Sequence, residues 1–125
     1  MTQRVIWAGC GRHAEQMLLP QLMRHDVELV GVCDINRSAA DKVAGRYGVK
    51  HVATDFDELL ALPNIDIAGM AAGPAQHRDL SIAALRAGEN IYVEKPLAHT
   101  IEEGQDIVRE AKKAGKVVQV GTQNR

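Results

Sequence analysis

Short apolar runs alternate along this chain with longer segments in which apolar residues recur every three or four positions. The short runs predict six strands, at residues 4–8, 28–33, 51–53, 66–71, 90–93 and 116–120. The segments between them predict five helices, at residues 13–24, 38–47, 57–62, 76–87 and 101–114. Strands that alternate with helices favour right-handed crossovers and a parallel sheet. We therefore predict an α/β fold with a six-stranded, doubly wound sheet of order 3-2-1-4-5-6.

Several residues predict where the helices begin and end. Asp55 and Thr100 are candidate N-caps, and Glu103 stands three residues after Thr100, which is capping-box spacing. Pro20 falls inside the first predicted helix and is expected to kink it. Left-handed C-cap residues are expected just past three predicted helix ends, at Gly48, Gly88 and Gly115.

Composition and charge narrow the possible functions. Hydrophobic residues make up 46% of the 125 residues but aromatic residues only 3%, so the core must be aliphatic. A net charge of -1 gives no electrostatic basis for binding nucleic acid or an anionic membrane. No apolar run approaches the roughly 20 residues that span a bilayer. We expect a cytoplasmic protein with two free thiols, Cys10 and Cys33.

The first strand leads directly into a glycine-rich turn. Its sequence is Gly-x-Gly-x-x-Ala at Gly9, Gly11 and Ala14, and a predicted helix follows. The first glycine allows a tight turn, the second lets a pyrophosphate approach the backbone, and the alanine lets the helix pack close to the strand. Asp34 closes the next apolar run. This layout is typical of a dinucleotide-binding Rossmann domain, which we assign to residues 1–125.

The acidic residue favours NAD as the cofactor. A carboxylate at Asp34 can accept hydrogen bonds from both adenosine ribose hydroxyls and would repel a 2′-phosphate. NADP is not excluded, because Arg37 follows closely and could hold that phosphate. An S-adenosylmethionine-dependent methyltransferase is the main alternative with the same fold. The predicted cofactor contacts in this region are Gly9, Cys10, Gly11, Arg12, His13, Asp34, Ile35 and Arg37.

A second motif follows the fifth predicted strand. Glu94 and Lys95 leave the end of that strand and are followed by Pro96, which restricts the backbone at both its own position and the preceding one. A lysine at the carboxyl edge of such a sheet is suited to polarise a hydroxyl or carbonyl and to move its proton. A surface ion pair at a strand end is the simpler alternative.

These motifs resemble the N-terminal domain of the glucose–fructose oxidoreductase / inositol dehydrogenase (Gfo/Idh/MocA) family. The resemblance covers essentially the whole chain. It rests on Ala-Gly-Cys-Gly-Arg-His-Ala at 8–14, Val-Cys-Asp-Ile-Asn at 32–36, Gly-Pro-Ala-Gln-His at 73–77, Ala-Leu-Arg-Ala-Gly at 84–88, Glu-Lys-Pro-Leu-Ala at 94–98 and Gln-Val-Gly-Thr-Gln-Asn-Arg at 119–125.

The resemblance implies a role for several residues. Lys95 takes the position of the family's catalytic lysine, and Glu94 lies against the nicotinamide half of the cofactor. The loop after the fourth strand borders the cofactor through Ala72, Pro74 and His77. Asn124 and Arg125 approach the nicotinamide and substrate side. No His, Cys and Asp cluster has metal-ligand spacing, so we expect no metal site.

The resemblance also implies a polyol or sugar substrate, oxidised or reduced by hydride transfer with NAD(P). Family members continue into a second domain that supplies much of the substrate pocket, and we expect this chain to lack it. Binding of NAD(H) without efficient turnover is therefore the favoured expectation, because catalysis needs a positioned substrate. Alternatives are a stand-alone NAD(H)-binding or NADH-sensing module, and a small dehydrogenase assembled as an oligomer. A homodimer formed through the sixth strand is a further expectation.

Overall fold

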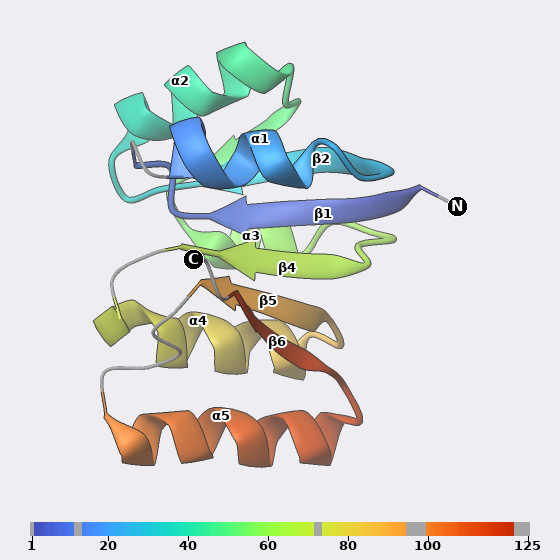
Figure 1. Cartoon of the computed structure of the whole chain (residues 1–125), viewed down its shortest axis with the longest axis vertical. Coiled ribbons are helices and arrows are strands. Elements are labelled where there is room, and N and C mark those ends of the chain that lie inside the picture. Colours follow the sequence, from blue (N-terminus) through green and yellow to red (C-terminus); the bar gives the residue numbers. More distant parts are fainter. Residues whose placement is uncertain (1, 12–13, 72–73, 95–99, 122–125) are drawn as a thin grey trace.

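The computed structural model describes residues 2–11, 14–71, 74–94 and 100–121. Its centre is a parallel sheet of six strands in the order β3-β2-β1-β4-β5-β6. The strands are β1 (Gln3–Ala8), β2 (Val27–Cys33), β3 (His51–Ala53), β4 (Ile67–Met70), β5 (Asn90–Glu94) and β6 (Val118–Gly121). This order confirms both the predicted fold class and the predicted strand order. The strands follow chain order outward in both directions from the β1–β4 pair (Figure 1).

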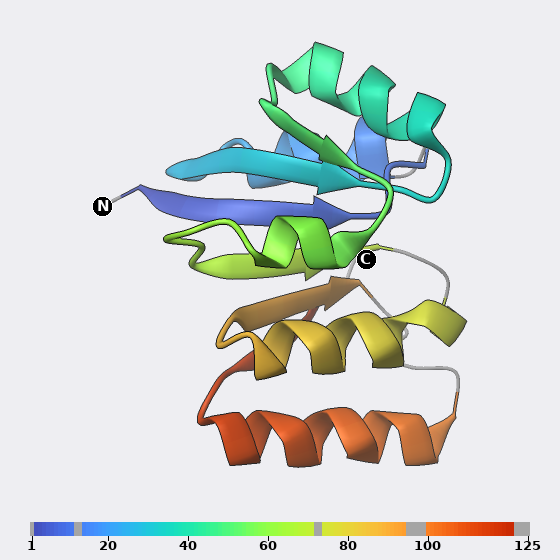
Figure 2. The same ribbon diagram turned by 180° about the vertical axis from the view of Figure 1, so that it is seen from behind.

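Helices cover both faces of the sheet. They are η1 (Ala14–Leu18), α1 (Leu19–Leu22), α2 (Arg37–Tyr47), α3 (Phe56–Leu60), α4 (Pro74–Arg86) and α5 (Ile101–Ala114). Figure 1 shows α1 and α2 with β1 and β2 in the upper half of the molecule, and Figure 2 shows α3 and α4 on the opposite face. Each face therefore has its own apolar cluster, one around Trp7, Leu19 and Val43 and the other around Ile6, Met70 and Ile107.

The predicted caps are largely confirmed. Asp55 accepts a hydrogen bond from the Asp57 amide, and Thr100 accepts one from the Glu103 amide at 3.1 Å. Gly48, Gly88 and Gly115 all have positive φ, as expected of residues that end helices. The N-cap of α2 is Asn36, whose side chain accepts from the Ser38 amide.

The first helix departs from the prediction. Residues Ala14–Leu18 form a π-helical turn, and an α-helix continues only over Leu19–Leu22. Pro20 has no N–H, and its ring would collide with the carbonyl four residues earlier, so the regular α-helical ladder cannot pass through this point. Instead of a kinked helix to residue 24, the chain makes a wide turn and a short helix.

Helix α2 holds this wide turn in place. Glu15 is buried at 6% exposure, and its carboxylate lies 3.5 Å from the Lys42 ammonium and 3.8 Å from the Arg46 guanidinium. The Tyr47 hydroxyl donates to the Glu15 carbonyl at 2.8 Å. The start of the first helix is therefore tied to α2 through both the side chain and the backbone of one residue.

Candidate functional site

A cavity of about 890 Å³ opens at the carboxyl ends of the strands. Its lining comes from the ends of β1 and β2, the β3–α3 connection, the residue after β4, and one side of α4. The neighbours β1 and β4 are where strand order reverses, and ligands of open α/β sheets bind at that point. The lining residues are Ala8, Gly9, Gly11, Cys33, Asp34, Ile35, Thr54, Asp55, Phe56, Asp57, Ala71, Gln76, Asp79, Leu80 and Ala83.

The glycine loop forms one wall of this cavity. Gly9 has a φ of 100°, which only glycine adopts without strain, and its amide donates to the Cys33 carbonyl at 2.9 Å. A Cβ added at Gly11 would meet nothing within 4 Å among the described residues. The backbone at Gly11 is therefore open to a ligand, as a pyrophosphate cradle requires.

Asp34 follows β2 directly and is fixed by two backbone amides. Its Oδ2 accepts from the Cys10 amide at 2.7 Å, and its Oδ1 accepts from the Asn36 amide at 2.8 Å. Each carboxylate oxygen retains capacity for a second hydrogen bond. The carboxylate is thus held at the cavity wall with both oxygens able to accept a further hydrogen bond from a ribose hydroxyl.

Ile35 follows this carboxylate in sequence and is 91% exposed, the largest exposure among the exposed large hydrophobic residues that the structure describes. An exposed aliphatic side chain at a cavity wall fits the apolar face of a purine ring. The open backbone, the oriented carboxylate and this apolar side chain together fit the adenosine half of a dinucleotide.

The two cysteines near the loop are buried free thiols. Burial, reinforced by the charge of Asp34, raises the pKa of Cys10 to about 12 and that of Cys33 to about 11. The Cys10 thiol donates to the Cys33 carbonyl at 3.5 Å. Their side chains belong to different apolar clusters, Cys33 to one and Cys10 to the other.

Arg37 lies apart from the main cavity. Its Nε donates to Asp41 at 3.1 Å, and it lines a separate hollow of about 320 Å³ that also contacts Lys50 and His51. The basic group that could have held a 2′-phosphate is therefore engaged elsewhere.

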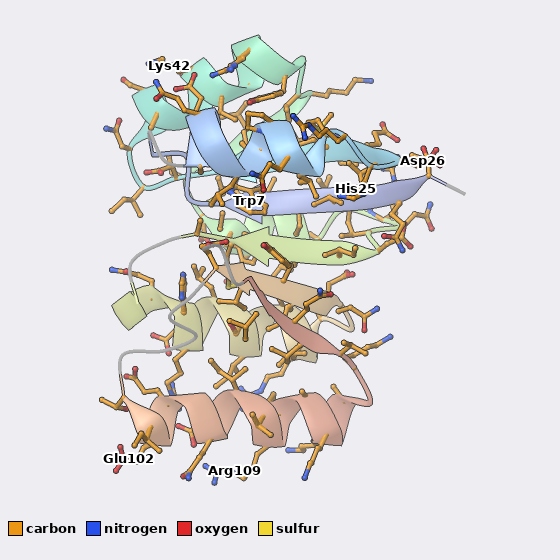
Figure 3. All side chains as sticks on the ribbon, viewed as in Figure 1. Trp7, His25, Asp26, Lys42, Glu102 and Arg109 are labelled. Atoms are coloured by element: carbon orange, nitrogen blue, oxygen red, sulfur yellow. The ribbon has the colours of Figure 1, made fainter. Side chains whose placement is uncertain are left out.

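The loop after β4 leads into α4, which begins at Pro74. His77 is buried on that helix at 2% exposure, while its neighbours Gln76, Asp79 and Leu80 line the cavity. His25 and His51 are exposed, and Figure 3 shows His25 near the end of the sheet where the chain starts.

Glu94 is the last residue of β5 and is buried at 7% exposure. The Tyr92 hydroxyl donates to its Oε2 at 3.4 Å. Burial and the charge of Glu94 raise the pKa of Tyr92. The predicted site residues Arg12, His13, Ala72 and Lys95, together with Asn124 and Arg125, lie outside the described residues.

Two groups of cavity residues were not identified from the sequence. One is the β3–α3 connection with the start of α3, at residues 54–57, and the other is the side of α4 that carries Gln76, Asp79, Leu80 and Ala83. The only sequence signal for the first was the cap motif at Asp55. A third omission is the Trp7 side chain, whose Nε1–H donates to the Gly9 carbonyl at 2.8 Å.

Two negative findings apply to the described residues. They contain no group of three or more His, Cys, Asp or Glu residues that could hold a metal ion. Within the same ranges, no helix combines the length and the apolar character needed to cross a membrane.

Comparison with known proteins gives a consistent match over nearly the whole chain. Residues 3–122 match the profile of the Gfo/Idh/MocA proteins, which is described as an oxidoreductase family with an NAD-binding Rossmann fold. The 4-carboxy-2-hydroxymuconate-6-semialdehyde dehydrogenase of Sphingobium sp. strain SYK-6 is 30% identical over 94% of this chain and 38% of its own length. The D-glucoside 3-dehydrogenase of Escherichia coli K12 is 33% identical over 92% of this chain and 33% of its own length.

Solved structures agree with this match. The WlbA dehydrogenase from Chromobacterium violaceum, solved with NADH and UDP-GlcNAcA, superimposes with a TM-score of 0.92 at 32% identity. The superposition covers 99% of this chain and 36% of that protein. The chain therefore spans about a third of the length of these similar proteins.

Proposed function

Because this chain belongs to the Gfo/Idh/MocA family of oxidoreductases and matches its NAD-binding Rossmann domain, we propose that residues 1–125 form one domain that binds NAD(H) in the cavity at the carboxyl ends of the strands. The observation that carries this proposal is that Gly9, Gly11 and Asp34 line the same cavity. The open backbone at Gly11 leaves room for the pyrophosphate, and Asp34 accepts hydrogen bonds from the adenosine ribose hydroxyls.

The charge of the cavity favours NAD over NADP. Among the described lining residues, the charged ones are all acidic, namely Asp34, Asp55, Asp57 and Asp79. A 2′-phosphate beside Asp34 would meet negative charge, and Arg37 is held by Asp41 at 3.1 Å. NADH should therefore bind more tightly than NADPH, although these residues do not forbid NADPH.

The remaining cofactor contacts that we propose come from the sequence. Cys10, Arg12, His13, Ile35 and Arg37 surround the adenosine and phosphate half, with Arg37 reaching the ligand only if it leaves Asp41. Ala72, Pro74 and His77 belong to the bordering loop and helix. Glu94 lies on the nicotinamide side.

A nicotinamide cofactor held in this cavity would supply hydride transfer to or from a carbon that bears a hydroxyl group. We assign Lys95, directly after the buried Glu94, to hold the substrate hydroxyl and move its proton. The similarity to a D-glucoside 3-dehydrogenase and to a dehydrogenase solved with UDP-GlcNAcA favours a sugar or polyol substrate. Residues 1–125 by themselves should bind the cofactor without efficient turnover, because catalysis needs a positioned substrate.

The direct test is calorimetric titration of the chain with NADH and with NADPH. We expect saturable binding of NADH and at least about tenfold weaker binding of NADPH, as expected for a charged group facing a phosphate. Absence of NADH binding at millimolar ligand would refute the proposal. A parallel assay with NAD and a panel of polyols tests turnover, and appreciable rates would refute the binding-only expectation.

We also propose weak self-association through β6, an edge strand with β5 as its neighbour in the sheet. Val117, directly before it, is 64% exposed. Sedimentation velocity over a range of concentrations should show a rising average mass, and a constant monomer mass at high concentration would contradict self-association.

A further inference from the structure

The peptide that joins Gly9 to Cys10 is held at both of its polar ends. Its carbonyl, on Gly9, accepts from the Trp7 indole N–H at 2.8 Å. Its amide, on Cys10, donates to Asp34 Oδ2 at 2.7 Å. One side chain from β1 and one from the end of β2 thus fix the plane of the peptide at which the chain leaves the sheet.

The Trp7 ring has little freedom to move. It is 1% exposed and lies in the apolar cluster beside α1 (Figure 3). Trp7, Gly69 and Tyr92 occupy one register row across β1, β4 and β5. A Cβ at Gly69 would come within 2.5 Å of the Trp7 ring, so the absence of a side chain there lets the indole lie flat over β4.

The Tyr92 ring also lies beside the Trp7 ring. The centroids of the Trp7 and Tyr92 rings are 6.3 Å apart with an interplanar angle of 33°. A tilted aromatic pair at this distance is attractive. The indole is therefore fixed by packing, and its N–H points at Gly9 before any ligand arrives.

We infer that Trp7 is a positioning residue for the phosphate loop: its indole N–H fixes the Gly9–Cys10 peptide so that the backbone beyond it presents Gly11 to a pyrophosphate. The inference rests on the proposed function. Gly9 has positive φ and rotates easily, so its carbonyl needs a donor to keep it turned toward the sheet. Without that donor, Asp34 alone holds this peptide through the Cys10 amide, and the carbonyl oxygen can tilt toward the ligand, where it would repel phosphate oxygens.

The test separates the hydrogen bond from the volume of the ring. Trp7 is the only tryptophan, so it can be replaced by 3-benzothienylalanine, in which sulfur takes the place of the indole N–H. Trp7→Phe provides a second variant. Affinities for ADP, NADH and adenosine are measured by titration, and thermal unfolding identifies any variant that fails to fold.

We expect the benzothienyl variant to bind ADP and NADH about fivefold more weakly, the typical value of one neutral hydrogen bond. Its affinity for adenosine, which contains no phosphate, should stay unchanged. A purely structural role would weaken all three ligands alike. Equal loss for adenosine and ADP, or no loss for ADP, would overturn the inference.

Nuclear magnetic resonance supplies a readout that does not depend on variants. The single indole N–H signal of the unsubstituted chain should exchange slowly with solvent, and it should shift when ADP is added but not when adenosine is added. Rapid exchange in the free chain would overturn the inference. If the unsubstituted chain binds neither ADP nor NADH, the proposed function fails as well. If the unsubstituted chain binds ADP and NADH and the benzothienyl variant binds them equally well, only the proposed role of Trp7 is refuted.

Discussion

Asp34 Oδ2 accepts a hydrogen bond from the Cys10 amide at 2.7 Å, so the acidic residue after β2 also organises the glycine loop after β1. Its second oxygen accepts from the Asn36 amide at 2.8 Å. The glycine loop after β1 and the end of β2, which both line the cavity, are therefore coupled through one carboxylate. A change at Asp34 should alter both ribose recognition and loop geometry.

Asp34→Asn tests this double role. The amide keeps one acceptor oxygen, but its NH₂ group would face the Cys10 or Asn36 amide as a second donor. We expect NADH affinity to fall by about tenfold or more, which is typical for loss of a hydrogen bond to a charged group. The preference for NADH over NADPH should narrow, because the repulsion of a 2′-phosphate is removed. Titration of both cofactors measures the two effects.

Asp57→Asn is the matched control, since Asp57 lines the same cavity and the substitution removes the same charge. Its affinity for NADH should stay within about twofold of the unsubstituted chain, because screened charges at a distance contribute little. Equal losses in the two variants would mean that net charge, rather than the bonds of Asp34, determines affinity.

Gly11→Ala tests the open backbone. A Cβ at Gly11 meets nothing within 4 Å among the described residues, so we expect folding to be preserved. The methyl group would occupy the space that the pyrophosphate needs, and NADH affinity should fall by about tenfold or more, as expected from loss of a charge-assisted contact. Calorimetry measures the affinity, and urea unfolding measures stability.

Gly45→Ala makes the same chemical change within α2, where a Cβ also meets open space. It should leave NADH affinity unchanged and raise the free energy of unfolding by about 0.5–1 kcal/mol, because alanine is the better helix former. If Gly11→Ala bound NADH as well as Gly45→Ala does, the phosphate would have to lie elsewhere.

The sequence was sufficient to predict the sheet but not the details of the site. The short apolar runs predicted all six strands, and the alternation of strands and helices predicted a doubly wound Rossmann sheet, which implies their order. The π-helical turn at Ala14–Leu18 was missed, since a hydrophobic period cannot distinguish a π turn from an α turn. The bond from Trp7 to Gly9 was also missed, because it depends on the direction of one indole N–H.

Side-chain partners also separate residues that the sequence places together. Asp34 and Arg37 are three positions apart, and both were candidates for the ribose end of the cofactor. In the structure Asp34 faces the main cavity, whereas Arg37 pairs with Asp41 one helical turn ahead on α2. Whether the Arg37 side chain pairs with a neighbouring carboxylate or faces a ligand depends on its rotamer, which no sequence pattern specifies.

Gly69→Ala should destabilise the fold through Trp7. The added Cβ would lie 2.5 Å and 2.6 Å from two ring atoms of a fully buried indole, so the ring or β4 must shift. Overpacking of this kind costs about 1–3 kcal/mol. Urea unfolding should show the loss.

Trp7→Phe combined with Gly69→Ala should cost less than the sum of the two single changes, because the smaller ring makes room. Strict additivity of the two changes would show that the methyl group and the ring do not collide.

The buried thiols should make stability depend on pH above neutrality. The pKa of Cys10 rises from an ordinary 9.0 to about 12, chiefly through burial, so the folded chain keeps a proton that the unfolded chain has lost. Stability should be unaffected by this thiol below pH 9 and should fall as pH rises toward 12, by up to about 1.4 kcal/mol per pH unit. The free energy of unfolding of Cys10→Ala, measured in urea, should fall less steeply with pH between pH 9 and pH 10.5 than that of the unsubstituted chain. Between pH 7 and pH 8 the two chains should show the same pH dependence. Identical slopes for the two chains above pH 9 would show that the Cys10 thiol titrates normally in the folded state.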